Sequence, residues 1–328
     1  MILVTGGTGL VGSHLLRTLI KQEPNEPIRA IKRKSSKMDL VEDIAHQINW
    51  LDVDLLAVAD LRKAMKEVSK IYHCAAVIAF DSAQFEWMHR VNMEGTANVV
   101  NLALEEGVEK MVHVSSIAAI GRSERNNQVS EATKWEDSSY NSQYAISKYR
   151  AEMEAWRGIA EGLNIVIVNP SVILGEGRWD EGSSQLIAKA AKGMSFYPDG
   201  GTGFVDVKDV VNVMVELMES NITNERFILN GVNITYRDFL TQAALVFHKS
   251  PPRFKVPSWL ASLSWRLAKP LSWISRKPPL ITKETAQLMQ LQYFYDNSKI
   301  QKMAGFEFRP LKDTLQRIAG NFVLKNKS

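Results

Sequence analysis

A tyrosine and a lysine four residues apart are the pair best placed for chemistry in this sequence. Tyr144 and Lys148 stand in Tyr144-Ala-Ile-Ser-Lys148, so on a helix both side chains project from the same face. An unperturbed tyrosine keeps its proton up to about pH 10, and a nearby ammonium group lowers that value toward the working range of an enzyme. Ser116, at the end of the preceding predicted strand, adds a hydroxyl hydrogen bond to the same oxygen. Together they would form an acid and an electrostatic clamp for a carbonyl group.

Tyr and Lys at this spacing are also common on an exposed helix face, and the glycine-rich N-terminus decides between the two interpretations. An apolar strand at residues 2–4 runs into Thr5-Gly6-Gly7-Thr8-Gly9-Leu10-Val11-Gly12. Gly6 permits a sharp turn, Gly9 lets a pyrophosphate approach the backbone, and Gly12 lets the next helix pack closely. The helix directs its positive end at the anion. We therefore predict a phosphate-binding loop that includes Thr8 and Leu10.

A glycine triplet alone can be a chance turn, but its context fits a βαβ unit. Strand and helix patterns alternate through the first half of the chain with short connections, which predicts an α/β fold with a doubly wound parallel sheet. We expect strands at residues 28–31, 48–53, 70–75, 110–115 and 164–169. We expect helices at residues 10–20, 85–106, 140–161 and about 207–219.

The pattern loosens after Pro170, where glycine-rich loops are expected at residues 175–182 and 193–203. The sequence therefore indicates two lobes. Residues 1–170 and about 204–232 would form the dinucleotide-binding Rossmann domain, and residues 171–203 and about 233–328 a smaller, mainly helical lobe for the substrate.

The end of the second predicted strand is basic, and this position selects the dinucleotide because the adenosine ribose lies there. Lys32-Arg33-Lys34, followed by Lys37, offers positive charge and a guanidinium fork to a 2′-phosphate, which favours NADP(H) over NAD(H). The alternative is a solvated loop. After the third strand, Asp54 and Leu55 are placed to hydrogen-bond and cover the adenine, although Asp54 is equally suited to cap the next helix.

Composition excludes several other classes of protein. The 328 residues carry a formal charge of only +4 that is not gathered in one half, which argues against nucleic-acid binding. The single cysteine, Cys74, excludes an internal disulfide and is expected to be a core thiol, and the histidines show no metal-site spacing. A strand that starts at Met1 leaves no room for a signal peptide, and apolar runs stay short of a membrane span, so we expect a cytoplasmic protein.

With these residues, the sequence resembles the extended short-chain dehydrogenase/reductase family, also described as NAD-dependent epimerases/dehydratases. Its nearest members are the dihydroflavonol reductases and 3β-hydroxysteroid dehydrogenases. The resemblance covers most of the chain. Besides the glycine loop and Tyr-x-x-x-Lys, its marks are His73-Cys-Ala-Ala76, Val91-Asn-Met-Glu-Gly-Thr96, Val114-Ser-Ser116 before Gly121, Asn169-Pro-Ser-Val172 and Gly203-Phe-Val-Asp-Val-Lys-Asp209.

The resemblance assigns roles to these residues. It implies that Ser116, Tyr144 and Lys148 are the catalytic triad and that Lys148 also grips the nicotinamide ribose. It implies that cofactor contacts come from Ala75, Ala76 and from Pro170 to Val172. Asn92 would support the site or be structural, and His73 would be a packed strand residue. Asp206 and Asp209 would cap the helix that they open.

The leading hypothesis is an NADP(H)-dependent oxidoreductase that moves a hydride between nicotinamide and a carbonyl or secondary alcohol, with Tyr144 exchanging the proton. An alternative is an epimerase or dehydratase of a nucleotide sugar that retains NAD(P). A third class, a redox-sensing binding module, is disfavoured because the triad is intact. The helices near Phe85 and Tyr140 could pair in a homodimer.

The segment from Val256 to Leu280 gathers Trp259, Trp265 and Trp273 between four prolines. Such pieces are too short for independent helices and must pack on something. Three interpretations stay open: ordinary core of the smaller lobe, a basic and aromatic contact with a membrane surface, or a lid that closes over a hydrophobic substrate. A lid would favour a mostly apolar ketone or alcohol as substrate.

Overall fold

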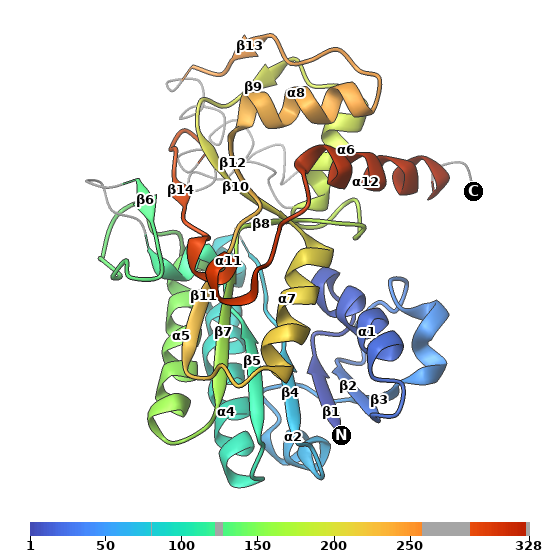
Figure 1. The fold of residues 1–328 in the computed structure, drawn as a ribbon, viewed down its shortest axis with the longest axis vertical. Coiled ribbons are helices and arrows are strands. Elements are labelled where there is room, and N and C mark those ends of the chain that lie inside the picture. The colour runs from blue at the N-terminus through green and yellow to red at the C-terminus, as the bar shows by residue number, and fades with distance from the viewer. Residues whose placement is uncertain (80, 122–126, 258–288, 326–328) are drawn as a thin grey trace.

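The computed structural model describes residues 1–79, 81–121, 127–257 and 289–325 (Figure 1). Its main sheet comprises β1 (Ile2–Thr5), β2 (Ile28–Lys32), β3 (Asn49–Asp52), β4 (Lys70–His73), β5 (Lys110–Val114), β7 (Ile165–Pro170) and β11 (Glu225–Leu229). The helices that cover this sheet are α1 (Leu10–Gln22), α2 (Val58–Met65), α3 (Phe85–His89), α4 (Gly95–Glu105), α5 (Gln143–Ala160) and α7 (Val207–Glu219).

The seven strands lie in the order β11-β7-β5-β4-β1-β2-β3, and all neighbouring pairs are parallel. The order reverses at β1, which is the arrangement of a doubly wound dinucleotide-binding sheet. The predicted fold class is therefore confirmed. All residues of β5 and β7 are buried, as expected of parallel strands that are covered on both faces.

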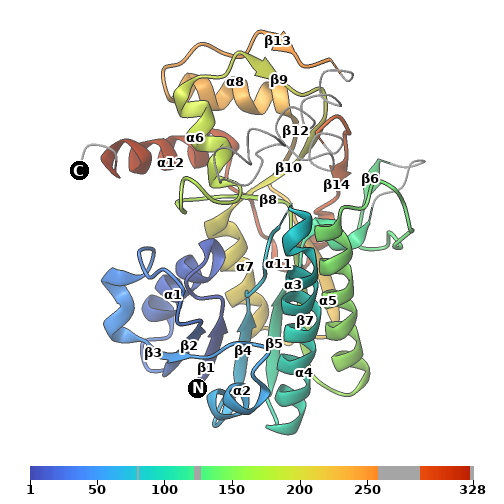
Figure 2. The same cartoon turned by 180° about the vertical axis from the view of Figure 1, so that it is seen from behind.

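Two apolar cores hold the layers together, one on each face of the sheet. On one face α1 and α7 pack side by side, and Leu15, Leu16 and Leu19 of α1 are fully buried there. On the other face α2, α4 and α5 lie together over residues such as Ile71 and Met111 (Figures 1 and 2). The long apolar helices thus fix the carboxyl edge of the sheet, where ligands of such folds bind.

A smaller lobe covers this edge. It contains the three-stranded sheet β12-β10-β8 and a stacked pair of rings, Phe204 and Phe239, whose centroids lie 4.1 Å apart. Its strands are β8 (Val172–Leu174), β9 (Phe196–Tyr197), β10 (Gly201–Asp206), β12 (Val232–Thr235) and β13 (Phe254–Lys255). Its helices are α6 (Ser184–Lys192), α8 (Tyr236–Val246) and α12 (Leu311–Lys325). Further short elements are β6 (Gln128–Val129), β14 (Phe294–Tyr295) and α11 (Ser298–Ala304).

Several strands were not predicted from the sequence pattern, and β10 and β11 are the most informative of them. The predicted loop at residues 193–203 ends in β10, because its glycines serve close strand packing. A Cβ atom on Gly203 would lie 2.2 Å from Oδ1 of Asn230, and one on Gly201 would lie 2.9 Å from the Ile234 carbonyl. The seventh strand of the main sheet, β11, was also not predicted. Only its pairing with β7 identifies it as an edge strand.

The largest differences from the predicted helices lie in two places. The predicted helix at residues 85–106 is one helical path, but it changes to a π-helical turn at Arg90–Glu94 between α3 and α4. Helix α5 begins at Gln143, later than the predicted start at Tyr140, because Ser142 caps it and accepts a hydrogen bond from the backbone N–H of Ala145.

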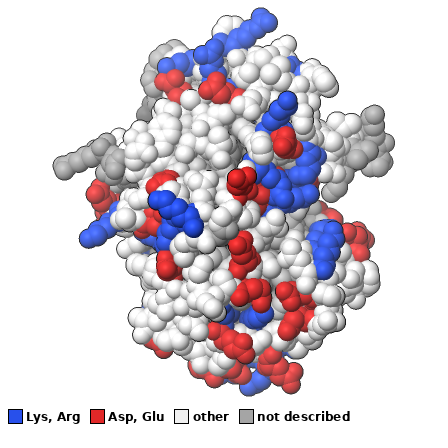
Figure 3. Space-filling model, in the orientation of Figure 1, with Lys and Arg blue, Asp and Glu red and all other residues white. Residues whose placement is uncertain are grey.

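Acidic and basic side chains are interspersed over the face drawn in Figure 3, where the larger basic group is bordered by acidic residues. In the part of the chain that the structure describes, no helix is both long and apolar enough to cross a membrane. The tryptophans at residues 259, 265 and 273 lie outside the described residues.

Candidate active site

The glycine loop has the geometry that the sequence predicted. Gly6 adopts a positive φ of 69°, and a Cβ atom there would lie 2.7 Å from the backbone nitrogen of Ala75. A Cβ atom on Gly12 would lie 2.2 Å from the Gly6 carbonyl oxygen. Glycine is therefore required at both positions, at Gly6 by the turn and at Gly12 by the close packing of α1.

The N-terminus of α1 fits a diphosphate. Gly9 is its N-cap residue and supplies no side-chain acceptor, and the first turn, which starts at Leu10, holds no acidic residue. The first backbone N–H groups of the helix therefore keep their hydrogen-bonding capacity for an anion. These observations support binding of a dinucleotide through its phosphates.

A buried histidine joins the loop to the neighbouring strand. His73 bonds through Nδ1 to the Thr5 hydroxyl (2.7 Å) and through Nε2 to the Thr96 hydroxyl (3.0 Å), and Thr5 accepts the N–H of Ala75 (3.1 Å). Burial, assisted by the charge of Lys148, lowers the pKa of His73 to about 3. His73 is thus a neutral packed residue, as expected, and it positions the chain at Ala75 and Ala76.

The basic segment after β2 is largely paired within the protein. Lys32 forms an ion pair with Asp52, and Lys37 pairs with Glu181 at 3.2 Å. Arg33 instead lies against the Trp87 ring, with its guanidinium carbon 5.0 Å from the ring centroid. Of the predicted 2′-phosphate ligands, Arg33 and Lys34 are thus not paired with a described carboxylate, and Arg33 is the one of these two that carries a guanidinium fork.

At the end of β3, Asp54 does not cap α2. Its Oδ1 accepts the backbone N–H of Leu56 (2.9 Å), which closes a local turn, and α2 has no side-chain cap. Leu55 is buried against the position of Gly95 at the start of α4. Both residues follow β3, the edge strand of the sheet, and their contact with the adenine stays a prediction.

Ser116, Tyr144 and Lys148 come together where β5 ends and α5 begins. The Ser116 hydroxyl lies close enough to the Tyr144 phenol to affect its pKa. Ser116 also caps the short helix at Ile117–Ile120, and its Oγ accepts the N–H of Ala118 (3.1 Å). Lys148 is 2% exposed and donates from Nζ to the Val114 carbonyl (2.9 Å).

The electrostatics of this group differ from the prediction that Lys148 lowers the pKa of Tyr144. Burial raises the pKa of Tyr144, and the nearby Ser116 hydroxyl opposes that shift. Burial also lowers the pKa of Lys148 to about 8, against the opposing charge of Glu152. The cause is desolvation, because burial removes both groups from water and disfavours their charged forms. Tyr144 is therefore a neutral phenol at pH 7, suited to donate a proton.

Asn92 connects the π-helical turn to both sides of the site. Its Oδ1 accepts the N–H of Val77 (2.7 Å), and its Nδ2 donates to the Val77 carbonyl (2.9 Å) and to the Ser147 hydroxyl (3.0 Å). The chain beyond β4 is thereby fastened to the helix that carries Tyr144. Pro170 ends β7 and Val172 begins β8, so both residues lie at the carboxyl end of β7.

Sequence reasoning missed two groups. Arg178 donates to the Thr8 carbonyl (3.2 Å) and pairs with Asp39 (2.6 Å), so the loop after β8 is tied to the phosphate loop. Glu152, buried one turn beyond Lys148, binds Arg226 at 3.0 Å. Its position four residues after Lys148 was the available signal, since it continues the Tyr144 and Lys148 row along one helix face.

Of the two residues predicted to cap α7, only one does so. Asp206 caps the helix by accepting the N–H of Lys208 (2.8 Å), as expected. Asp209 does not act as a cap. It pairs with Arg309 and accepts the Arg309 backbone N–H at 2.8 Å, because it lies within the first turn and faces the chain before α12.

The described residues contain no cluster of three or more His, Cys, Asp or Glu suited to a metal.

Comparison with known proteins shows what the chain is similar to. Residues 2–230 match the NAD dependent epimerase/dehydratase family. The chain is 30% identical over 321 residues to a Synechocystis sp. protein assigned as a dihydroflavonol 4-reductase, covering 95% of this chain and 91% of that protein. It is 29% identical over 315 residues to sterol demethylase protein B of Methylococcus capsulatus, with 92% of each chain covered.

A solved structure extends the comparison to the fold. The crystal structure of gox2253 superimposes with a TM-score of 0.83 at 29% identity, and the match covers 99% of this chain and 98% of that one. With the glycine loop, the parallel sheet and the family match, the protein is an NAD(P)-dependent oxidoreductase, a reductase or dehydrogenase of the extended short-chain type. The chain belongs to the NAD dependent epimerase/dehydratase family.

Proposed function

We propose that the protein is an NADP(H)-dependent ketone reductase or secondary-alcohol dehydrogenase whose substrate is mostly apolar. The observation that carries the proposal is the grouping of Ser116, Tyr144 and buried Lys148 at the edge of the sheet that holds the glycine loop. Such a group polarises a carbonyl oxygen and supplies its proton.

Each residue of the proposed site has a distinct task. The bound dinucleotide would supply or accept the hydride. Tyr144, which stays protonated because burial raises its pKa, donates its hydroxyl proton to the carbonyl oxygen during reduction and takes it back during oxidation. Ser116 hydrogen-bonds to the same oxygen. Lys148 holds a positive charge beneath the phenol at pH values below about 8.

We propose NADP(H) as the preferred cofactor because Arg33 keeps its guanidinium available whereas Lys32 and Lys37 are paired with carboxylates. A guanidinium fork matches the geometry of a phosphate. The remaining contacts of the proposed cofactor site come from Gly6, Thr8, Gly9, Leu10, Gly12, Asp54, Leu55, Ala75, Ala76, Lys148, Pro170 and Val172.

The apolar substrate is supported by the names of the two relatives, a dihydroflavonol reductase and a sterol demethylase component, both of which denote ring-bearing molecules without a sugar diphosphate. We further propose that residues 171–203 and about 233–328 bind this substrate while the remainder binds the dinucleotide. A cytoplasmic location and a homodimer stay predictions.

A steady-state screen tests the proposal. NADPH oxidation would be followed with alicyclic and aromatic ketones, and NADP⁺ reduction with the matching alcohols. The same preparation would be assayed for epimerisation and dehydration of UDP-, GDP- and dTDP-sugars, because the family match also includes that chemistry. Turnover with the apolar compounds is expected. Turnover confined to sugar nucleotides would replace the proposal with the epimerase or dehydratase alternative.

A further inference from the structure

A buried carboxylate lies directly behind the proposed catalytic residues. Tyr144, Lys148 and Glu152 follow one another at one-turn intervals along α5, and Glu152 is 1% exposed. A buried carboxylate is costly unless it is paired and hydrogen-bonded. The contacts of Glu152 therefore indicate what it does in this position.

Four donors converge on the two oxygens of Glu152. Oε2 accepts the Ser115 hydroxyl (2.6 Å) and Nδ2 of Asn169 (2.7 Å). Oε1 accepts Nη1 of Arg226 (3.0 Å) and the indole N–H of Trp156 (3.3 Å). The carboxylate thus joins α5 to β7, β11 and the end of β5.

Two of these contacts lead directly to the reacting groups. Ser115 precedes Ser116, and Nδ2 of Asn169 donates a second hydrogen bond, of 3.0 Å, to the Ser116 carbonyl. Glu152 therefore fixes the backbone that carries Ser116 as well as the helix that carries Tyr144.

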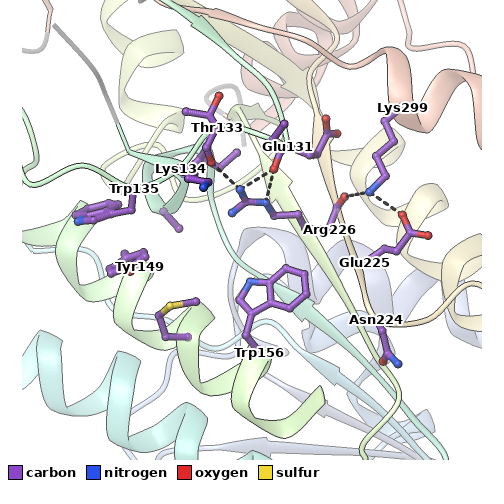
Figure 4. Close-up of a pocket in the computed structure, with 14 residues that line it drawn as sticks. Glu131, Thr133, Lys134, Trp135, Tyr149, Trp156, Asn224, Glu225, Arg226 and Lys299 are labelled. Atoms are coloured by element: carbon purple, nitrogen blue, oxygen red, sulfur yellow. Dashed lines mark hydrogen bonds and ion pairs between the residues drawn. The ribbon is translucent and has the colours of Figure 1, made fainter. Parts of the chain in front are cut away.

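Arg226 is held rigidly on the far side of the carboxylate. Its Nε and Nη2 donate to the Glu131 carbonyl (3.0 and 2.7 Å), and Nη2 also donates to the Thr133 carbonyl (2.8 Å). Figure 4 shows Arg226 and Trp156 on the wall of an open cavity, which has a volume of about 550 Å³. The guanidinium is thus fixed from outside while Glu152 stays buried.

We propose that Glu152, anchored by Arg226, is the positioning residue of the site and the counter-charge of Lys148. The titratable groups that face Lys148 support this assignment. Cys74 and Glu152 raise the pKa of Lys148, and burial raises the pKa of the Cys74 thiol to about 12, so this thiol carries no charge near pH 8. His73 and His113 have lowered pKa values and stay neutral. Among the described residues, Glu152 is thus the carboxylate that keeps Lys148 charged.

The test compares Glu152→Gln, which keeps size and hydrogen bonding but removes the charge, with Glu154→Gln. Glu154 lies on the same helix and pairs at 2.8 Å with Arg157, away from the site. The ligand-free protein would be labelled with ¹³Cε-lysine, and Lys148 would be assigned in the NMR spectrum through Lys148→Arg. In Glu152→Gln the titration midpoint of Lys148 should fall by about one pH unit or more, the effect of losing an adjacent opposite charge. In Glu154→Gln it should not move.

A second variant should shift the titration midpoint of Lys148 in the opposite direction. Arg226→Gln removes the guanidinium that neutralises Glu152, so the midpoint of Lys148 should rise. Circular dichroism would confirm that each variant folds. If Glu152→Gln does not fold, Glu152→Asp, which retains the charge, is compared with Arg226→Gln in its place. A Lys148 midpoint that is the same in wild type, Glu152→Gln and Arg226→Gln would overturn the proposal.

The kinetic consequence rests on the proposed function, whereas the NMR titration does not. In Glu152→Gln the alkaline limb of the kcat profile should shift to lower pH by the same amount as the Lys148 midpoint, with KM changed less than kcat. Absence of turnover on every ketone would contradict the proposed function alone. An unshifted kcat profile in an active, folded Glu152→Gln variant would contradict the role of Glu152.

Discussion

In the proposed mechanism Tyr144 acts through its hydroxyl proton. Removal of the hydroxyl group should therefore slow the chemical step and leave cofactor binding intact. Tyr144→Phe should lower kcat by about 10²–10⁴-fold, the usual contribution of a positioned acid. Cofactor affinity should remain close to wild type because the ring still fills its place. Titration calorimetry with NADPH and single-turnover kinetics measure the two quantities.

Ser116→Ala should cost less than Tyr144→Phe, because Ser116 assists the oxygen but transfers no proton. The variant also loses the cap of the helix at Ile117–Ile120, so its folding should be checked by thermal unfolding. Full turnover in Tyr144→Phe would show that another group supplies the proton.

Arg33 tests the preference for the phosphorylated dinucleotide. Arg33→Ala should weaken NADPH binding by about 1.5 to 3 kcal/mol, the range for a hydrogen bond to a charged group, and leave NADH nearly unchanged. Lys32→Ala is the matched control, since Lys32 is paired with Asp52 and should not discriminate between the cofactors. Dissociation constants from calorimetry decide. Equal losses for both cofactors, or equal wild-type affinities, would refute the preference for NADP(H).

At the scale of an element, the approach of α1 to the glycine loop depends on the missing side chain of Gly12. A Cβ atom there would lie 2.2 Å from the Gly6 carbonyl oxygen, which is backbone and cannot move aside cheaply. Gly12→Ala should therefore destabilise the protein by about 1–3 kcal/mol, as overpacking does, and displace the helix end that we expect to bind the diphosphate. Urea unfolding and calorimetry with NADPH measure the two effects.

Gly320 provides the matched control for this substitution. It is exposed in α12, and a Cβ atom there would meet nothing within 4 Å. Gly320→Ala should stabilise the protein by about 0.5–1 kcal/mol through helix propensity, without changing cofactor binding. Equal unfolding free energies for the two alanine variants would mean that the close contact at Gly12 is not rigid.

At the scale of the whole molecule, two buried histidines make the fold sensitive to acid. Burial lowers the pKa of His73 to about 3 and that of His113 well below its ordinary value, and their rings stack 5.3 Å apart. Below pH 6.5 the unfolded chain binds protons that the native protein does not bind. Stability should therefore fall as pH drops from about 6.5 toward 4, by roughly 1.4 kcal/mol per pH unit for each histidine.

His113→Phe separates the two contributions. Neither ring nitrogen of His113 has a hydrogen-bond partner, so replacement of this buried ring should cost little at pH 7. The slope of unfolding free energy against pH should become shallower by the contribution of one histidine, measured by urea unfolding between pH 4.5 and 7. A slope identical to wild type would show that His113 titrates normally in the native protein.

The sequence alone determined the sheet class, the glycine loop and the row formed by Tyr144 and Lys148. These features depend on local causes. Gly6 and Gly12 are dictated by backbone geometry over a few residues, and a spacing of four on a helix fixes a common face whatever packs against it. Continuous apolar runs such as those at residues 110–115 and 164–169 likewise indicate strands covered on both sides.

Only the tertiary structure decided which charges remain available and what burial does to them. The pairing of Lys32 with Asp52 joins residues about 20 positions apart in the sequence, and Arg226 of β11 reaches Glu152 of α5. The raised pKa of Tyr144 depends on removal of water by several elements at once. Edge strand β11 is recognised only by its partner β7. Long-range pairing and desolvation are collective effects, and no short stretch of sequence encodes them.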